Sequence, residues 1–172
     1  MPTKTSGTLI ADLRDATAAD LQAISDIFNY YALNSTANFA TAPESLEERK
    51  MWFSQHATAG LPVLVAELQG RIVGWASLSP YHSRCAYSQS VEPSVYIHAE
   101  FIGKGLGKQL LRRLVTLAGA RRYHCLVALI CSENTGSIEL FRTFGFEPSG
   151  RLKEVGRKFD RWLDVVLMQK VL

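Results

Sequence analysis

The segment SVYIHAEFIGKGLGKQLL, residues 94–111, decides the fold of this chain. An apolar strand leads into a turn with glycines at 103, 105 and 107, and a helix begins inside that turn. Apolar residues then recur with a period of about 3.6 residues as far as about residue 120. This arrangement predicts several free backbone N–H groups around one point, which attracts anions.

The rest of the chain predicts a mixed α/β domain. Its order is strand, helix, helix, three strands, helix, strand, helix, two strands, which implies hairpins first and then a parallel crossover through the long helix. We expect a disordered tail at residues 1–8 and one domain over residues 9–172. The predicted strands are 9–14, 63–68, 72–79, 91–97, 126–130 and two around Trp162, and the other helices follow capping boxes at Thr17 and Ser45 or span 137–144.

Composition and charge exclude several classes of protein. The chain has 172 residues, is 47% hydrophobic and carries a net charge of +3. These values suit a single core-forming domain, and the dispersed charge is too mild for a nucleic-acid-binding protein. Three cysteines without CxxC spacing indicate reduced thiols. Since no signal peptide or membrane span is visible, we expect a cytoplasmic protein with no membrane or nucleic-acid partner.

Two histidines have no spacing typical of a metal site. His56 and His124 stand far from each other and are not grouped with carboxylates. We therefore expect both to lie on the surface, and we expect no bound metal.

The glycine-rich turn does not fit the commoner nucleotide-binding motifs. A Walker A loop requires Lys followed by Ser or Thr, whereas Lys108 is followed by Gln109. The dinucleotide-binding pattern requires a third glycine where Lys108 stands. By itself, the turn leaves two interpretations open, an anion site and a plain tight turn.

The surrounding sequence resembles the GNAT superfamily of N-acetyltransferases. Its acetyl-CoA loop reads Gln/Arg-x-x-Gly-x-Gly/Ala before a long helix, which matches residues 102–107, and ENTGSIELFRTFGF follows at 133–146. More narrowly, the chain is similar to the phosphinothricin and methionine sulfoximine acetyltransferase branch. That likeness covers nearly the whole chain and rests on LRDAT at 13–17, STANF at 35–39, VEPSVYI at 91–97 and KFDRWLDVVLMQ at 158–169.

The resemblance implies a single-domain GNAT fold that binds acetyl-CoA as co-substrate. Its mixed sheet of about six to seven strands would be flanked by about four helices. The fourth and fifth strands would splay apart to hold the cofactor. The backbone of the fourth strand would bind the pantetheine arm, the turn would bind the pyrophosphate, and the amide of Asn134 would lie near the thioester, although a plain helix cap is its alternative role. The implied cofactor-binding residues are Val95, Tyr96, Ile97, Gly103, Lys104, Gly105, Leu106, Gly107, Lys108 and Asn134.

Acetyl transfer to an amine needs a group that accepts a proton near neutral pH. Glu92 matches the acidic residue of the resembled branch, and apolar neighbours would raise its pKa. Its alternative is a solvent-exposed carboxylate at a strand edge. Cys131 is a less suitable candidate, as a nucleophile, because no histidine is designated to activate it.

Two residues depart from the family pattern. Ile102 replaces the usual Arg or Gln at the start of the acetyl-CoA loop, so we expect weaker cofactor binding, with Lys104 and Lys108 supplying charge. Phe141 replaces the Tyr or His that would protonate the leaving thiolate. A thiol with a pKa of about 8.5 is nevertheless a tolerable leaving group without an acid.

In the resembled branch the acceptor is a small amino-acid analogue, bound by the loop between the third and fourth strands. Here that loop spans 80–90 and offers His82 and Arg84, whose guanidinium suits a carboxylate or phosphinate. Phe39 would form a wall of the pocket or belong to the core, and Trp162 would pack in the core or in a homodimer. Two alternatives stay open: a protein or peptide N-acetyltransferase, and a catalytically weak acyl-CoA-binding regulatory module.

Overall fold

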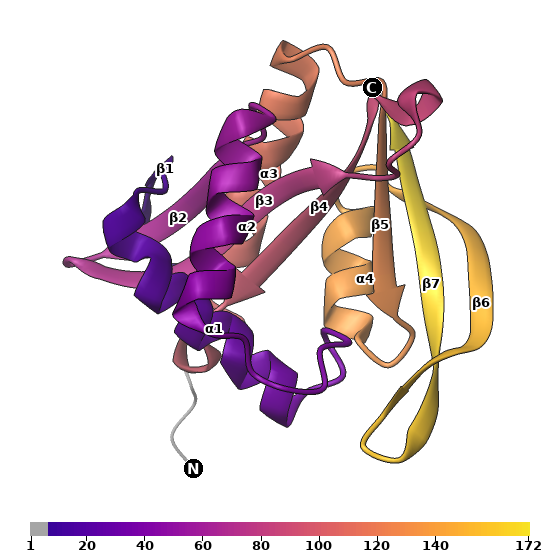
Figure 1. Cartoon of the computed structure of the whole chain (residues 1–172), viewed down its shortest axis with the longest axis horizontal. Helices are drawn as coiled ribbons and strands as arrows, with labels where there is room; N and C mark the ends of the chain where they lie inside the picture. Colours follow the sequence, from indigo (N-terminus) through magenta and orange to yellow (C-terminus); the bar gives the residue numbers. More distant parts are fainter. Residues whose placement is uncertain (1–6) are drawn as a thin grey trace.

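Seven strands form one mixed sheet in the order β1-β2-β3-β4-β5-β7-β6 (Figure 1). The computed structural model describes residues 7–172 of the chain. The strands are β1 (Asp12–Asp15), β2 (Val63–Leu68), β3 (Arg71–Pro80), β4 (Ser90–Ile97), β5 (Cys125–Cys131), β6 (Glu147–Lys158) and β7 (Arg161–Val171). The helices are α1 (Leu21–Asn34), α2 (Leu46–Thr58), α3 (Leu106–Ala120) and α4 (Thr135–Arg142). The predicted fold class is confirmed.

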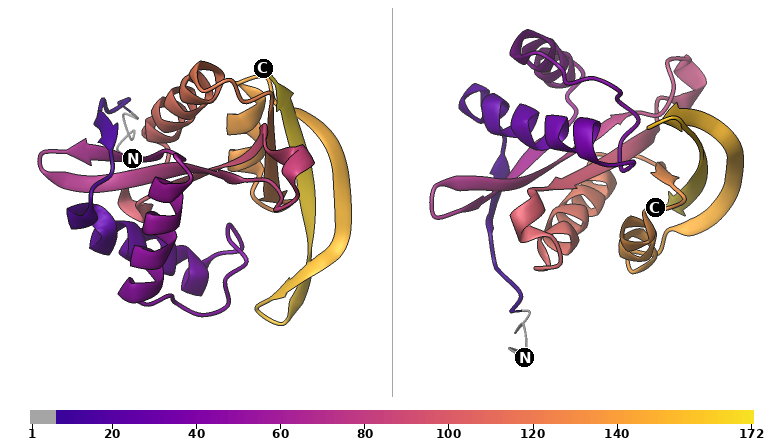
Figure 2. Two further views of the ribbon diagram at one scale, coloured as in Figure 1. Left: turned by 45° about the horizontal axis from the view of Figure 1, so that its top comes forward. Right: turned by 90° about the horizontal axis from the view of Figure 1, so that it is seen from below.

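The four helices divide between the two faces of the sheet. Figure 2 shows α1 and α2 on one face and α3 and α4 on the other. On the α3 face the leucines of that helix pack into the larger core cluster, and its amphipathic spacing explains why this side of the helix turns inward. On the α1 face a smaller cluster surrounds Trp75. The helices on each face therefore bury their apolar side chains against that face of the sheet.

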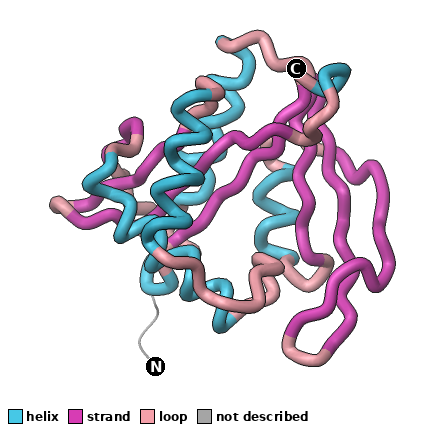
Figure 3. The backbone as a smooth tube through the Cα atoms, in the orientation of Figure 1, coloured by secondary structure: helices cyan, strands magenta, loops and turns pink. Residues whose placement is uncertain are grey.

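Strands β4 and β5 are parallel neighbours only at their beginnings. The pairs Ser90–Cys125 and Val91–Leu126 are the two in register, after which the strands diverge (Figure 3). β4 stays paired with β3 to Ile97, and β5 stays paired with β7 to Cys131. The sheet is thus continuous at one end and split at the other.

Pro93 gives a local reason for this divergence. In β4 the N–H of His98 donates to Val73 and the carbonyl of Ser90 accepts from Tyr81, so even-numbered residues direct their backbone groups to β3. Odd-numbered residues therefore point toward β5. Pro93 is the next such residue after Val91, and because proline has no N–H the ladder loses a donor there.

Predicted elements and observed elements agree in type, and their boundaries differ by a few residues. The capping box of Ser45 and Glu48 opens α2 as predicted, whereas the one at Thr17 opens a short 3-10 turn ahead of α1. The last helix begins two residues earlier than predicted. Its start is set by Asn134, whose side chain accepts from the Ser137 amide.

One prediction about exposure is wrong, and the prediction for Trp162 loses one of its two alternatives. His56 is buried, not on the surface, since its ring nitrogens lie 2.9 Å from the Trp52 carbonyl and 3.1 Å from the Ser79 hydroxyl. Hydrogen bonds of this kind make a buried histidine tolerable, and its spacing in sequence gave no sign of them. His124 is exposed as expected. Trp162 is 61% exposed and thus outside the core of the single chain.

The start of the described chain runs along the turn before α3. Leu9 donates to the Lys104 carbonyl, and the Gln109 side chain bonds Leu9 and Ala11 on either side of Ile10. Most of the tail predicted at residues 1–8 lies outside the described residues.

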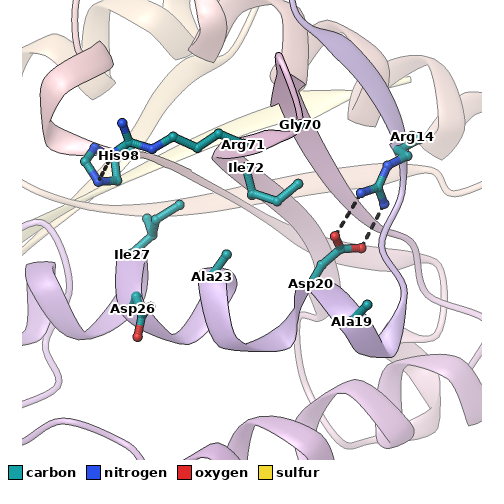
Figure 4. Close-up of a pocket in the computed structure, with 10 residues that line it drawn as sticks. All are labelled: Arg14, Ala19, Asp20, Ala23, Asp26, Ile27, Gly70, Arg71, Ile72 and His98. Atoms are coloured by element: carbon teal, nitrogen blue, oxygen red, sulfur yellow. Dashed lines mark hydrogen bonds and ion pairs between the residues drawn. The ribbon is translucent and has the colours of Figure 1, made fainter.

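Arg14 and Asp20 join the first strand to the start of α1. Figure 4 shows the two hydrogen bonds between them, both 2.8 Å long. Asp20 also accepts from the Thr17 amide and hydroxyl, while Arg14 reaches Glu67 of β2. The hydrogen bonds from Arg14 are the main cause that lowers the pKa of Asp20 to about 2.

Because this pKa lies below the ordinary value, ionised Asp20 stabilises the fold above about pH 4, and that contribution is lost as the pH falls toward about 2. We expect Asp20→Asn to lower the free energy of unfolding by about 1–2 kcal/mol at about pH 7, after allowance for the partial exposure of Arg14. Urea denaturation should show the deficit shrinking in acid. Asp12→Asn, at an exposed position of β1, is the control, and an equal loss in both variants would contradict the account.

Candidate functional site

The divergence of β4 and β5 opens a cleft of about 1290 Å³. Its walls come from β4, β5, the start of α3, the start of α4 and the segment that follows α1. Ten of the residues predicted for the site lie together around it: Phe39, Glu92, Val95, Tyr96, Ile97, Gly103, Gly105, Gly107, Lys108 and Asn134.

The glycine-rich turn presents a row of unused backbone donors to this cleft. Gly103 and Gly105 have φ angles of +78° and +81°, a conformation that favours glycine, and Gly105 is the N-cap of α3. Among the described residues, nothing accepts a hydrogen bond from the amides of residues 103–108. Amides at a helix start carry partial positive charge. This geometry is that of an anion site and goes beyond a plain turn.

The exposed edge of β4 also offers backbone groups. The N–H and carbonyl of Val95 and the N–H of Ile97 point toward the cleft, because odd-numbered residues face away from β3. The Ile97 carbonyl already accepts from the Tyr31 hydroxyl at 2.6 Å. The backbone of Tyr96 faces β3, so among residues 95–97 only Val95 and Ile97 direct backbone groups toward the cleft.

The cleft passes from one face of the sheet to the other. Val95 and Ile97 direct their side chains to the α3 face, where both pack against the larger core cluster. Glu92 and Tyr96 alternate with them and lie on the α1 face, where Tyr96 stacks on Trp75 at 4.6 Å. The glycine-rich turn and the Glu92 carboxyl thus lie on opposite faces of one opening.

Glu92 is a half-buried carboxyl without a partner. No hydrogen bond to it occurs within residues 7–172, and burial raises the pKa of its carboxyl. The Tyr96 hydroxyl is also buried, which raises its pKa to about 12. A carboxyl with a raised pKa beside a cleft suits a general base, and the alternative of a solvent-exposed edge carboxylate does not fit this burial.

The side chain of Asn134 can cap α4 and contact a ligand at the same time. Its Oδ1 accepts from the Ser137 amide at 3.2 Å and caps α4. Its Nδ2 donates to no other described residue, and Asn134 lines the cleft. The capping role is therefore compatible with a contact to a ligand.

The two residues that depart from the family pattern differ in exposure. Ile102 is 60% exposed at the mouth of the cleft. Phe141 is buried and packs edge-on against Phe146, with ring centroids 4.9 Å apart. A buried phenylalanine has no proton to give, so no acid exists at this position.

Four predicted residues do not line the cleft. His82 and Arg84 are exposed on the loop after β3, at the closed end of the β4–β5 pair. Lys104 places its ammonium over the Phe101 ring at 4.9 Å, and Leu106 is buried in the core. The backbone amides of Lys104 and Leu106 still belong to the row of free donors in the turn.

A smaller cavity of about 490 Å³ lies apart from this cleft, between α1 and the β2–β3 turn (Figure 4). Its polar side chains already have partners: Arg14 bonds Asp20, Arg71 lies 3.0 Å from the His98 ring, and Asp26 accepts from Gln22. None of the predicted site residues lines it.

Sequence reasoning missed three residues of the site. Tyr31 and Asn38 line the cleft, and Lys158 bonds both of them. Tyr31 had the helical spacing of a core residue, and the hydroxyl that reaches β4 leaves no trace in that pattern. Only the STANF and KFDRW stretches, already singled out by resemblance, marked the other two.

Comparison with known proteins identifies the family. A model described as Acetyltransferase (GNAT) domain matches residues 13–167. The chain belongs to the GNAT acetyltransferase family. It is accordingly an enzyme of the N-acetyltransferase class.

Three known proteins are similar to this GNAT acetyltransferase over nearly their whole length. An L-methionine sulfoximine/L-methionine sulfone acetyltransferase of Pseudomonas aeruginosa is 43% identical, with 92% of this chain and 93% of that protein covered. The structure of a phosphinothricin acetyltransferase from Sinorhizobium meliloti in complex with AcCoA has a TM-score of 0.93 and 39% identity, covering 95% and 89% of the two chains. A ribosomal-protein-alanine N-acetyltransferase from Brucella melitensis has a TM-score of 0.92 and 42% identity, covering 94% and 99%.

Two further observations concern residues 7–172. None of the helices there is long and apolar enough to cross a bilayer. No group of three or more His, Cys, Asp or Glu side chains in that range is placed to hold a metal ion.

Proposed function

We propose that the protein transfers the acetyl group of acetyl-CoA to the amino group of a small amino-acid-like acceptor, of the methionine sulfoximine, methionine sulfone or phosphinothricin type. One observation carries this proposal: a single opening through the sheet joins a turn with free backbone amides on one face to a half-buried, unpaired carboxyl on the other. Two substrates entering from opposite faces would meet between β4 and β5. The names of the Pseudomonas and Sinorhizobium relatives support the substrate class.

The residues of the α3 face fit acetyl-CoA. The free amides of residues 103–108 suit a pyrophosphate, and Lys108 adds charge from the wall of the cleft. The outward groups of Val95 and Ile97 suit the amides of a pantetheine arm, which would extend β4 like an added strand. Because backbone groups supply most of these donors, Ile102 weakens the site without abolishing it. Acetyl-CoA supplies an activated thioester.

The chemistry asked of the protein is proton removal and charge stabilisation. Glu92, on the α1 face, would accept the proton of the attacking amine, directly or through water. The N–H of Val95 points into the opening and would stabilise the negative charge that develops on the carbonyl oxygen. With Phe141 in the acid position, the thiolate would leave and take its proton from solvent.

Direct attack requires no covalent intermediate on the protein. Cys131 lines the opening but is buried, and neither histidine nor lysine bonds it in the described structure. Without such an activating group, a buried thiol is a poor nucleophile.

Aromatic side chains form part of the wall on the acceptor side. Phe39, Tyr31 and Tyr96 border it on the α1 face together with Glu92. A small amino acid derivative fits such walls better than a folded polypeptide. His82 and Arg84 stay predicted acceptor ligands, and their contribution requires movement of their loop or a neighbouring copy of the chain.

A homodimer is part of the proposal. The β6–β7 hairpin exposes Leu152, Val155, Phe159 and Trp162, and a second copy of the chain is the occupant we propose for this apolar surface. We place the protein in the cytoplasm, where acetyl-CoA is available and its three free thiols would stay reduced.

A peptide N-terminus is the second candidate acceptor. It is favoured by the similarity to the Brucella ribosomal-protein-alanine N-acetyltransferase. A protein substrate needs an open groove on the acceptor side, whereas the segment after α1 and the C-terminal hairpin meet there. The small acceptor is therefore preferred.

An acceptor panel tests the function. The protein is incubated with acetyl-CoA and methionine sulfoximine, methionine sulfone, phosphinothricin or a peptide with N-terminal alanine, and free thiol is followed. We expect turnover with at least one of the small acceptors at a kcat/KM of about 10⁴ M⁻¹s⁻¹ or more, and a value at least about tenfold lower for the peptide. Turnover of the peptide alone would establish the second candidate, and tight acetyl-CoA binding without any turnover would refute both.

Replacement of Glu92 by Gln tests the proposed base. Because Gln accepts no proton, we expect kcat to fall by about 100-fold near neutral pH and to recover as alkaline pH deprotonates the amine itself. Removing a buried, unpaired carboxyl should leave the stability unchanged or higher. Glu147→Gln, at an exposed position of β6, is the matched control. A neutral-pH kcat equal to that of the control would remove Glu92 from this role.

A further inference from the structure

Lys158 is a buried lysine that reaches across the opening. It is the last residue of β6, only 4% exposed, and its Nζ donates to the Tyr31 carbonyl at 3.1 Å and to the Asn38 carbonyl at 2.9 Å. A third bond, 3.3 Å long, goes to Oδ1 of Asn38. The hairpin turn, with Phe159 and Asp160 at positive φ, places this side chain opposite the C-terminus of α1.

These contacts use every donor that an ammonium group has. With three N–H groups and three acceptors, Lys158 has none left for a substrate, and its burial keeps it off the cleft surface. A role as base or substrate ligand is therefore excluded, and a role in holding other residues is left.

What Lys158 holds is the wall of the acceptor side. α1 has no basic residue in its own last turn, and the Lys158 ammonium supplies that charge to the carbonyl end of the helix. Asn38 fixes the next segment, so that residues 35–39, all of which line the cleft, are held at both ends. Tyr31 carries the connection onward, since its hydroxyl donates to the Ile97 carbonyl of β4.

Two further contacts from the β6–β7 hairpin support residues 35–39. Gly156 lies so close to the Phe39 ring that a Cβ there would come within 2.2 Å of it. Arg161 bonds both carboxylate oxygens of Glu133, at 2.8 and 3.0 Å, and Thr36 donates to that carboxylate at 3.4 Å. We call Gly156, Lys158 and Arg161 the C-terminal clasp.

We propose that Lys158 is a positioning residue for the acceptor substrate: through the C-terminal clasp it fixes residues 35–39 as the wall of the acceptor side, across the gap that the divergence of β4 and β5 creates. The proposal rests on the proposed function for its substrate. It assigns Lys158 a task in acceptor binding, whereas the turn at residues 103–108, which would bind the pyrophosphate, lies on the other face.

The test uses Lys158→Met, which keeps the aliphatic stem and removes the donors. Lys153→Met, at an exposed position of the same strand, is the matched control. We expect the acceptor KM to rise by about tenfold in the first variant, while the dissociation constant for acetyl-CoA stays within about twofold of the wild-type value. Amide hydrogen exchange over residues 35–39 should become faster in the first variant only.

An acceptor KM and an exchange rate equal to those of the control, in a folded variant, would overturn the proposal. An equal loss of acceptor and acetyl-CoA binding would also overturn it, because that result indicates general damage. If the wild-type protein acetylates none of the acceptors, the proposed function fails, and the exchange rates still decide whether Lys158 holds the segment.

A second variant keeps the test decisive if Lys158→Met does not fold. Gly156→Ala leaves the lysine in place and forces the Phe39 ring to move. We expect a higher acceptor KM with unchanged acetyl-CoA affinity. An unchanged acceptor KM in this variant would contradict the proposed role of the clasp.

Discussion

The divergence of β4 from β5 after Val91 leaves backbone groups of two central strands without strand partners in the middle of a sheet. Such groups are costly unless something bonds them, and Tyr31 satisfies only the Ile97 carbonyl. The N–H and carbonyl of Val95 remain available to hydrogen-bond a ligand that lies along β4 like an added strand. Pro93 has no N–H, so it cannot donate a hydrogen bond that would extend the pairing of β4 with β5. The anion-binding turn and the buried carboxyl gain their functional meaning from this opening.

The site also concentrates features that disfavour the folded protein on its own. Six turn amides lack acceptors in the described structure, and Glu92 is half-buried with no partner. Stability comes from elsewhere, from the leucine-rich core beneath α3 and from contacts such as Arg14–Asp20. Separation of the stable core from an opening with unpaired polar groups is common in enzymes, because functional groups need surroundings that a stability optimum would not choose.

The sequence allowed the architecture to be predicted because its signals are local. Helical periodicity in α3, the capping box of α2 and the glycine-rich turn each depend on neighbouring residues. Burial of His56 and the reach of Lys158 depend on partners far along the chain, so no local pattern reports them. Pro93 is a further local signal, because a proline within a strand predicts an interrupted ladder on one side of that strand. The positions of His82 and Arg84 away from the cleft follow from the β3–β4 register, which propensity does not set.

The central claim is that two substrates occupy opposite faces of one opening at the same time. Initial-velocity kinetics with acetyl-CoA and an accepted amine, both varied, test it directly. Simultaneous occupancy predicts double-reciprocal lines that intersect, with no acetyl group on the protein by intact mass after incubation with acetyl-CoA alone. Parallel lines together with an acetylated Cys131 would contradict the account, because they would show that the acetyl group passes through the protein before the acceptor binds.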